Sequence, residues 1–290
     1  MISDNTTDLG LTLVLGGTGK TGRRLANRLR EHGHTVRIGS RSASPGFDWE
    51  DPRTWGAALE GVQSVYITYA PDLAVPGAVE AIQAFTDRAV ASGVKRLVLL
   101  SGRGELEAQR CERVVQQAGI AWTIIRSSWF NQNFSEAFFR EMVEGGTIAL
   151  PAGDVAEPFV DCEDIADLAL AALTEPGHEG QLYEVTGPEL LTFRDVARLL
   201  SDATGREIRY VPLTDEQFAA AMAEEGVPED AVQMLTYLFR EVLDGRNSHL
   251  TDGVQRALGR EPRDFATYVK RAAAEGAWTT ATASSSSVEA

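Results

Sequence analysis

What this 290-residue chain lacks already limits its function. It has two cysteines, Cys111 and Cys162, too few for a disulfide framework or a zinc site, and we expect both to be small buried side chains. No apolar run is long enough to span a membrane, and the N-terminal residues are polar and acidic, unlike a signal peptide. These absences predict a cytoplasmic protein without a bound metal.

Positive charge is also scarce. There are 27 Lys and Arg residues against 42 Asp and Glu, a net charge of −15. Such a charge repels nucleic-acid phosphate and anionic lipid, so we expect no direct binding to nucleic acid or membrane. A local basic pocket can still hold an anionic cofactor. The length allows one large domain, or one domain with a smaller lobe.

The most informative stretch is LTLVLGGTGKTG, residues 11–22. An apolar strand runs into closely spaced glycines, and a helical pattern follows. This strand, turn and helix is the context in which GxGxxG binds the pyrophosphate of a dinucleotide. One alternative is a turn without a ligand; a P-loop is excluded because Val14 occupies the position of its first glycine. The predicted binding residues are Gly16, Gly17, Thr18, Gly19, Lys20, Thr21 and Gly22.

The end of the second strand, residues 35–39, indicates which dinucleotide binds. NAD-binding members of this fold place an Asp or Glu near this point to bind the adenosine ribose hydroxyls. Here the chain has Ser40, Arg41 and Ser42 instead. A guanidinium between two hydroxyls suits a ribose phosphate, which predicts NADP(H). The alternative is that Arg41 is only an exposed loop cation.

Strands and helices alternate through the first two thirds of the chain. Strands are expected at 62–70, 96–100, 122–125 and 181–186, with a short weak strand before Asp48, and helices at 75–92, 107–118 and 161–173. This order predicts an α/β fold with a Rossmann-type doubly wound parallel sheet, which binds ligands at the carboxyl ends of its strands. We expect Asp161 and Asp164 to be helix caps.

The later chain has a different pattern. Residues 149–160 are expected to form a loop, and 208–211 a strand among helices at 193–203, 218–223 and 230–243. We therefore expect a flexible lead at 1–9, an NADP(H)-binding domain at 10–150 whose sheet is completed by parts of 151–190, a mostly helical substrate or lid lobe at 191–278, and a disordered tail at 279–290.

An aromatic, amide-rich segment follows the strand at 122–125. Some of its aromatic side chains must be core, and others are expected to line an apolar substrate pocket with Asn133 as a polar group. The residues predicted to contact a substrate are Trp129, Phe130, Asn133, Phe134, Phe159 and Tyr237.

Five features together resemble a known family: the GGTGKTG loop, Arg41, the pair Asp48 and Trp49, RSSWFNQN at 126–133 and FVDCEDIAD at 159–167. Over residues 11–278 the chain resembles the NmrA-like branch of the atypical short-chain dehydrogenases. It looks most similar to bacterial relatives of the ergot-alkaloid agroclavine dehydrogenase and festuclavine synthase group.

The resemblance implies roles for particular positions. Gly17 to Gly22 would take the pyrophosphate, Arg41 and its serine neighbours the 2′-phosphate, and Asp48 and Trp49 would lie near the adenine. Tyr69, Ala70, Pro71, Ser101 and Gly102 would flank the nicotinamide half. It also implies NADP(H) and an oxidoreductase of secondary metabolism, and we expect a monomer or homodimer.

Typical short-chain dehydrogenases use a Tyr-x-x-x-Lys pair, in which the lysine lowers the pKa of the tyrosine so that it can exchange a proton with a carbonyl. The three lysines here, Lys20, Lys95 and Lys270, do not follow a tyrosine by four residues. The ordinary alcohol and ketone chemistry is therefore not expected, and no catalytic residue is assigned.

Three functions are compatible with these observations. The first is an NADPH-dependent reductase of an activated acceptor (iminium or imine, quinone or enone) on an aromatic or polycyclic small molecule, which needs position and a dry pocket more than a strong acid. The second is a non-catalytic NADP(H) sensor that binds a partner protein. The third is a redox-neutral isomerase or cyclase.

Overall fold

The computed structural model describes residues 10–137 and 139–279. Its centre is a six-stranded sheet in the order β2-β1-β3-β4-β5-β8, with every pair parallel. The strands are β1 (Leu11–Leu15), β2 (Thr35–Gly39), β3 (Val62–Ile67), β4 (Arg96–Gly102), β5 (Ala121–Ser127) and β8 (Gln181–Val185). The predicted doubly wound α/β sheet is confirmed.

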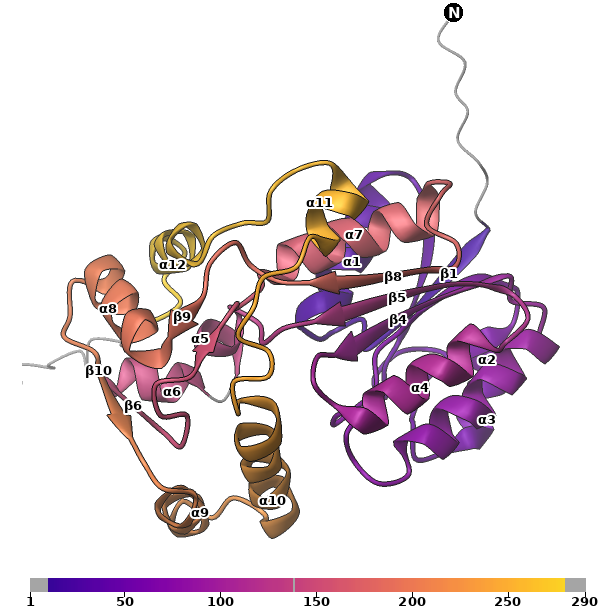
Figure 1. Ribbon diagram of the computed structural model, residues 1–290. Helices are drawn as coiled ribbons and strands as arrows, with labels where there is room; N and C mark the ends of the chain where they lie inside the picture. The colour runs from indigo at the N-terminus through magenta and orange to yellow at the C-terminus, as the bar shows by residue number, and fades with distance from the viewer. Residues whose placement is uncertain (1–9, 138, 280–290) are drawn as a thin grey trace, which may run out of the picture.

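Helices cover both faces of this sheet (Figure 1). One face carries α2 (Trp55–Leu59), α3 (Ala78–Ala91) and α4 (Leu106–Gln116), and the other α1 (Lys20–Glu31), α7 (Cys162–Thr174) and α11 (Gly253–Leu258). Successive strand side chains point to opposite faces, so Leu13 and Leu15 join the first layer while Val14 joins the second. Double coverage explains the uninterrupted apolar run Leu97-Val98-Leu99-Leu100 in the central strand β4.

A second layer of structure lies beyond the carboxyl ends of the strands (Figure 1). Its small sheets pair β6 (Thr147–Leu150) with β10 (Arg209–Pro212) and β7 (Ala156–Glu157) with β9 (Leu191–Thr192). Its helices are α5 (Asn133–Glu136), α6 (Phe139–Glu144), α8 (Phe193–Thr204), α9 (Asp215–Glu224), α10 (Glu229–Tyr237) and α12 (Phe265–Ala274). One apolar cluster running from Phe134 to Trp278 holds these elements together.

Three local expectations were wrong. No strand forms at residues 40–51 before Asp48, because the chain turns back so that Phe47 N donates to Ser40 O (2.9 Å) and the Phe47 ring is buried. The helix expected at 230–243 changes at Leu238 into a five-residue π-helix, η2 (Leu238–Val242). The expected loop at 149–160 includes β7 and the end of β6. The lead at 1–9, and residues 280–290 of the expected tail, lie outside the described residues.

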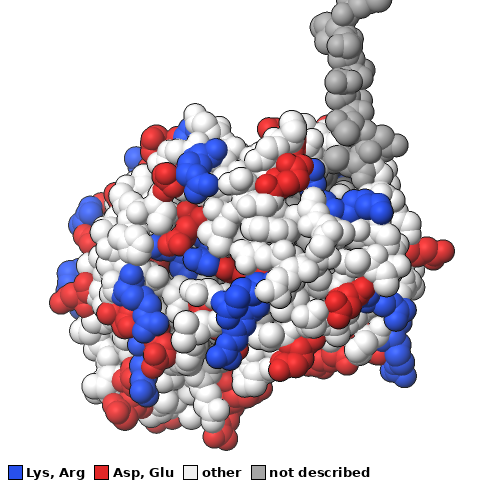
Figure 2. Space-filling model, turned by 45° about the vertical axis from the view of Figure 1, so that its right-hand side comes forward, with Lys and Arg blue, Asp and Glu red and all other residues white. Residues whose placement is uncertain are grey.

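Charged side chains of both signs are spread over the surface. On the face shown in Figure 2, acidic and basic side chains lie side by side instead of gathering into one basic patch. Within residues 10–137 and 139–279, no helix combines the length and the apolar character needed to cross a bilayer.

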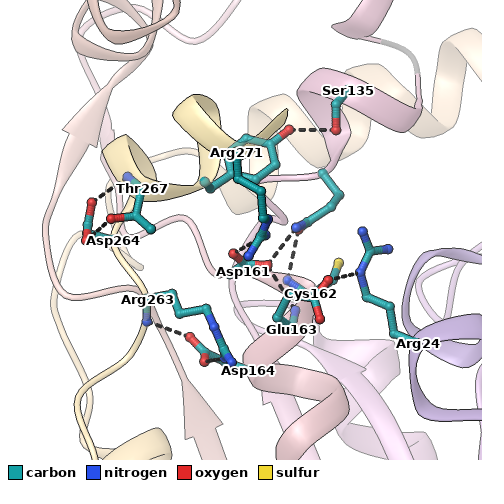
Figure 3. A network of polar contacts seen from close by, with 12 residues as sticks. Arg24, Ser135, Asp161, Cys162, Glu163, Asp164, Arg263, Asp264, Thr267 and Arg271 are labelled. Atoms are coloured by element: carbon teal, nitrogen blue, oxygen red, sulfur yellow. Dashed lines mark hydrogen bonds and ion pairs between the residues drawn. The ribbon is translucent and has the colours of Figure 1, made fainter. Parts of the chain in front are cut away.

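Acidic residues at the start of α7 bind arginines of α12 and of the segment before it (Figure 3). Asp161 caps α7 by accepting from Glu163 N (2.9 Å), as predicted, and also binds Arg271 of α12 (2.9 Å). Asp164 is buried as well, but it accepts from the backbone N–H of Arg263 (2.7 Å) instead of capping the helix. These contacts fix α12 against the start of α7.

Glu163 joins α7 to α1. Its carboxylate accepts from Arg24 Nε (2.6 Å) and from Arg28. Burial alone would raise the pKa of Glu163, but the hydrogen bonds from Arg28 and Arg24 prevail and lower it to about 2. Each arginine also has a second carboxylate, Glu136 for Arg24 and Asp167 for Arg28.

Replacing Glu163 by glutamine is expected to lower the free energy of unfolding by about 1 to 2 kcal/mol at neutral pH, a partial loss because both arginines keep another partner. The pKa in the folded state lies below its ordinary value of 4.5. The stabilisation that the ionised Glu163 contributes is therefore complete above pH 4.5, and it disappears as the pH falls toward about 2. Urea unfolding of both proteins over that range measures the effect.

The matched control is Glu207→Gln, because Glu207 pairs with Arg209 on the surface with both side chains 70% exposed. In the same urea experiment we expect no measurable change in the free energy of unfolding, since exposed pairs contribute little. Equal shifts from the two variants would contradict a special role for the contacts between α1 and α7.

Candidate functional site

The glycine loop between β1 and α1 is closely packed against its surroundings. Gly16 has a φ of +60°, and a Cβ there would lie 2.2 Å from Thr68 Oγ1. A Cβ on Gly22 would lie 2.3 Å from the carbonyl oxygen of Gly16. These positions require glycine, because the start of α1 can approach the end of β1 this closely only without side chains.

The start of α1 is suited to an anion. The first backbone N–H groups of a helix have no partner within the helix and carry partial positive charge. Lys20, the first residue of α1, adds an ammonium group for which the described chain offers no hydrogen bond or ion pair. Burial lowers the pKa of Lys20. The glycine cradle and the unpaired cation together fit a pyrophosphate.

The loop after β2 lies beside this cradle, because β2 pairs with β1 as far as Leu15 and Gly39. Ser40 Oγ and Ser42 Oγ are 3.3 Å apart. Arg41 between them is exposed, and no carboxylate of residues 10–137 or 139–279 lies within ion-pair distance of its guanidinium. The group is free to meet a ligand.

Asp48 and Trp49 are held by an aromatic cluster. Trp49 Nε1 donates to Thr68 O (3.1 Å), and its ring centroid lies 4.9 Å from that of Tyr69. Asp48 O accepts from Trp55 Nε1 (2.7 Å), and Asp48 Oδ1 accepts from Glu50 N (3.1 Å). Through Tyr69, this cluster adjoins the cavity described next.

A cavity of about 520 Å³ extends along the carboxyl ends of β1, β3, β4 and β5. Several residues predicted from the sequence line it together. From the cofactor set these are Gly16, Gly19, Lys20, Thr21, Tyr69, Ala70, Pro71, Ser101 and Gly102, and from the substrate set Trp129, Phe130 and Asn133. One space therefore joins the glycine loop to an aromatic wall.

Other predicted residues do not line the cavity. Eight of them belong to the glycine loop, the loop after β2 and the Asp48–Trp49 segment. They are Gly17, Thr18, Gly22, Ser40, Arg41, Ser42, Asp48 and Trp49. Phe134 and Phe159, expected in the pocket, are instead buried in the apolar cluster of the C-terminal layer, with ring centroids 5.6 Å apart. Tyr237 is 38% exposed and also lies off the cavity wall.

Among the wall residues absent from the sequence-based prediction, two groups bear on function. Leu238 and Val242 of η2 close the cavity from the C-terminal layer. Asp72, after β3, and Glu105, before α4, contribute two carboxyl groups that hydrogen-bond to each other. Glu105 lies in GRGELEAQRCERV, the segment where the Tyr-x-x-x-Lys pair would fall, so its position was a usable signal.

The environment of Glu105 favours its protonated form. Burial, the negative charge of Asp72 and the hydrogen bond with Asp72 raise the pKa of Glu105 to about 9. Burial also raises the pKa of Asp72. At neutral pH Glu105 is therefore in its protonated form.

The cysteines and other possible metal ligands lie elsewhere. Cys111 and Cys162 are both buried. In the part of the chain that the structure describes, no group of three or more His, Cys, Asp or Glu side chains is arranged to hold a metal ion.

Comparison with known proteins agrees with this architecture. The chain matches the NmrA-like family over residues 107–269 and an NAD(P)H-binding family over residues 16–176. It is 35% identical to agroclavine dehydrogenase of Claviceps fusiformis, over 89% of this chain and 95% of that one. It is 33% identical to an NAD(P)H azoreductase of Xenophilus azovorans, over 92% of this chain and 100% of the other.

Among solved structures, the triphenylmethane reductase of Citrobacter sp. complexed with NADP(H) superposes with a TM-score of 0.72. The two are 22% identical, and the match covers 90% of this chain and 99% of that one. At this identity the likeness shows a shared fold. Together with the two family matches and the relatives above, it confirms the resemblance drawn from the sequence, and the chain belongs to the NmrA-like family of NAD(P)H-binding oxidoreductases.

Proposed function

We propose that this protein is an NADPH-dependent reductase that transfers hydride to an activated acceptor on an aromatic or polycyclic small molecule. The acceptor is an iminium or imine, a quinone or an enone. When bound, the cofactor supplies the hydride from C4 of its nicotinamide. The observation that carries the proposal is the single cavity that joins the glycine loop to Trp129 and Phe130.

The cofactor assignments follow the order of loops along the sheet edge. The pyrophosphate lies on the glycine loop and Lys20, and the 2′-phosphate on Arg41 with Ser40 and Ser42. The adenine lies near Asp48 and Trp49. The nicotinamide half lies between residues 69–71 and residues 101–102. The unpaired cations Lys20 and Arg41 support this path, because each is available to an anionic group.

The acceptor class follows from the absent Tyr-x-x-x-Lys pair. An electrophilic acceptor takes hydride without a strong acid to polarise it, so position and exclusion of water become the main contributions of the protein. Two relatives of at least 33% identity, named as an agroclavine dehydrogenase and an azoreductase, support a conjugated or nitrogen-containing acceptor.

The C-terminal layer provides the substrate side of the cavity. Leu238 and Val242 line it together with Trp129, so we assign the lobe at 191–278 as a cover for an apolar substrate. The Trp129 ring packs on Phe139 (6.1 Å between centroids) and Phe239 (5.3 Å), which fixes it as a rigid wall.

The direct test mixes the purified protein with NADPH and a panel of quinones, enones and cyclic imines or iminium ions. We expect NADPH oxidation, followed by its absorbance, with at least one class. Absence of oxidation with every class would contradict the proposal. Comparable affinity for NADPH and NADP⁺ together with capture of a partner protein would favour the sensor, and rearrangement of a substrate without net oxidation would favour an isomerase or cyclase.

Replacing Trp129 by alanine is expected to raise the KM for an aromatic acceptor roughly 10-fold, since an aromatic contact contributes about 0.5–1.5 kcal/mol, and to leave the Kd for NADPH unchanged. Steady-state kinetics and a fluorescence titration measure the two constants. Trp122→Ala is the control, because Trp122 lies at the opposite end of β5. A rise in KM of the same size in both variants would count against the aromatic wall.

A further inference from the structure

Two carboxyl groups come together in the wall of the cavity. Asp72 comes from the loop after β3 and Glu105 from the residue before α4, so the tertiary fold alone brings them together. Both line the same cavity as the glycine loop and the aromatic wall. Glu105 is 7% exposed, and its carboxyl group shares a hydrogen bond with Asp72.

The loop that carries Glu105 is held in place by the two residues before it. The neighbouring Arg103 is buried, and its guanidinium donates to Glu184 Oε1 (2.8 Å) and Ser128 Oγ (2.9 Å). Gly104 has a φ of +79° and lies against Asn247, whose Nδ2 would be 2.6 Å from a Cβ at that position. The backbone before Glu105 is therefore held in one conformation.

The Glu105 side chain lies over the end of β4. A Cβ on Gly102 would be 2.2 Å from Glu105 Oε1, so the carboxyl group rests directly on this glycine. Glu105 occupies the N-cap position of α4, yet its side chain makes no capping hydrogen bond. The carboxyl group is thus directed to the cavity beside Ser101 and Gly102, the residues assigned to the nicotinamide half.

We propose that Glu105, positioned by Asp72, is the proton donor for acceptors that need a proton as well as a hydride. This inference rests on the proposed hydride transfer. With a quinone, hydride from NADPH adds to the quinone, one oxygen takes the displaced electron pair, and the Glu105 O–H bond breaks to protonate that oxygen. The products are hydroquinone and NADP⁺, and Glu105 regains its proton from solvent. An iminium ion needs only hydride, because its nitrogen becomes neutral when the π pair moves onto it.

The charges around Glu105 keep it protonated. Asp72 faces it from the loop after β3, Glu112 from α4 and Tyr237 from α10. Two cations lie nearby. Arg103 also lines the cavity but is paired with Glu184, and Arg246 contacts Gly104 O (3.4 Å) but is paired with Asp244. All three facing groups are neutral or negative at neutral pH. Because the pKa of Glu105 is raised to about 9, its acid form is present below that pH and is lost as the pH rises through it.

The test compares menadione, which takes hydride and a proton, with the 2-methyl-3,4-dihydroisoquinolinium ion, which takes hydride alone. In Glu105→Gln, the ratio of kcat/KM for menadione to that for the iminium ion should fall about 100-fold. Glutamine keeps the size of the neutral carboxyl group and a donor for Asp72, so the fold should be retained. Glu107→Gln, two residues further along α4 and paired with the exposed Arg110, should leave the ratio unchanged.

Two further measurements do not depend on that variant. Asp72→Asn removes the negative charge beside Glu105 and so lowers the pKa of Glu105. The fall of the menadione rate at alkaline pH should therefore move to lower pH. The iminium rate should show no such fall. Infrared spectroscopy at neutral pH should detect a protonated carboxyl C=O band in the wild type that is missing in Glu105→Gln.

The outcomes separate the inference from the proposed function. An unchanged ratio in Glu105→Gln, or an alkaline limb that Asp72→Asn does not move, would overturn the proton-donor role while NADPH oxidation by the wild type upholds the reductase. Absence of NADPH oxidation by the wild type with both of these acceptors and with every other class of the panel would overturn both.

Discussion

Replacing Gly22 by alanine is expected to weaken NADPH binding by about 100-fold or more, the equivalent of one or two hydrogen bonds to a charged group at about 1.5–3 kcal/mol each. The new Cβ would lie 2.3 Å from the carbonyl oxygen of Gly16, 2.8 Å from its carbonyl carbon and 3.0 Å from Gly17 Cα. All three are main-chain atoms, so no side chain can rotate away. The start of α1 must move off β1, and its free N–H groups move away from the pyrophosphate with it.

Fluorescence titration with NADPH measures this loss, and thermal unfolding shows how much of it is general destabilisation. Gly46→Ala is the matched control, because the nearest atom to a Cβ at Gly46 is 3.5 Å away, an ordinary contact distance. We expect near-normal affinity in the control. Tight NADPH binding by Gly22→Ala would show that the pyrophosphate lies elsewhere.

The Arg41→Ala variant is expected to bind NADPH about 10- to 100-fold more weakly and NADH almost unchanged, because a charge-assisted contact to phosphate contributes about 1.5–3 kcal/mol. The two cofactors differ only in the 2′-phosphate, so the difference isolates this contact. Arg41 is exposed and has no carboxylate neighbour among the residues described. Its removal therefore leaves no other charge unpaired.

Parallel titrations with NADPH and NADH at fixed ionic strength measure this discrimination. Arg53→Ala is the control, since Arg53 lies in the short 3-10 helix Pro52–Thr54, and its side chain is 90% exposed and paired with Asp51. It should affect neither cofactor. Equal losses of NADPH and NADH in Arg41→Ala would refute the assignment of the 2′-phosphate to this loop.

Arg41 and Gly22 also illustrate what can be predicted from a sequence. Their interpretation needs only neighbours in the chain: a strand, a tight turn and a helix for Gly22, and the end of the next strand for Arg41. Parallel strands bring all these turns to one sheet edge, so the edge could be predicted as well. The alternation of strands and helices predicted the sheet, and the capping role of Asp161 followed from its place before α7.

The aromatic residues show where such prediction stops. Trp129 and Phe134 lie five positions apart in one aromatic segment, yet Trp129 lines the cavity and Phe134 is buried in the C-terminal cluster. Composition alone cannot separate them, because a core and an apolar pocket favour the same side chains. The difference arises because Phe134, on α5, packs against Phe193 of α8 and Phe265 of α12, whereas Trp129 is only partly buried at the edge of the layer.

By itself, the sequence determined the sheet, the glycine loop and the arginine beside it, since each follows from residues close together in the chain. Only the tertiary structure decided which other residues complete the cavity beside them. Leu238 and Val242 reach the cavity from far along the chain, and Asp72 meets Glu105 across two different strands. The proton on Glu105 depends on that meeting, because burial and a neighbouring negative charge are properties of a place in the fold, and no local pattern of residues contains them.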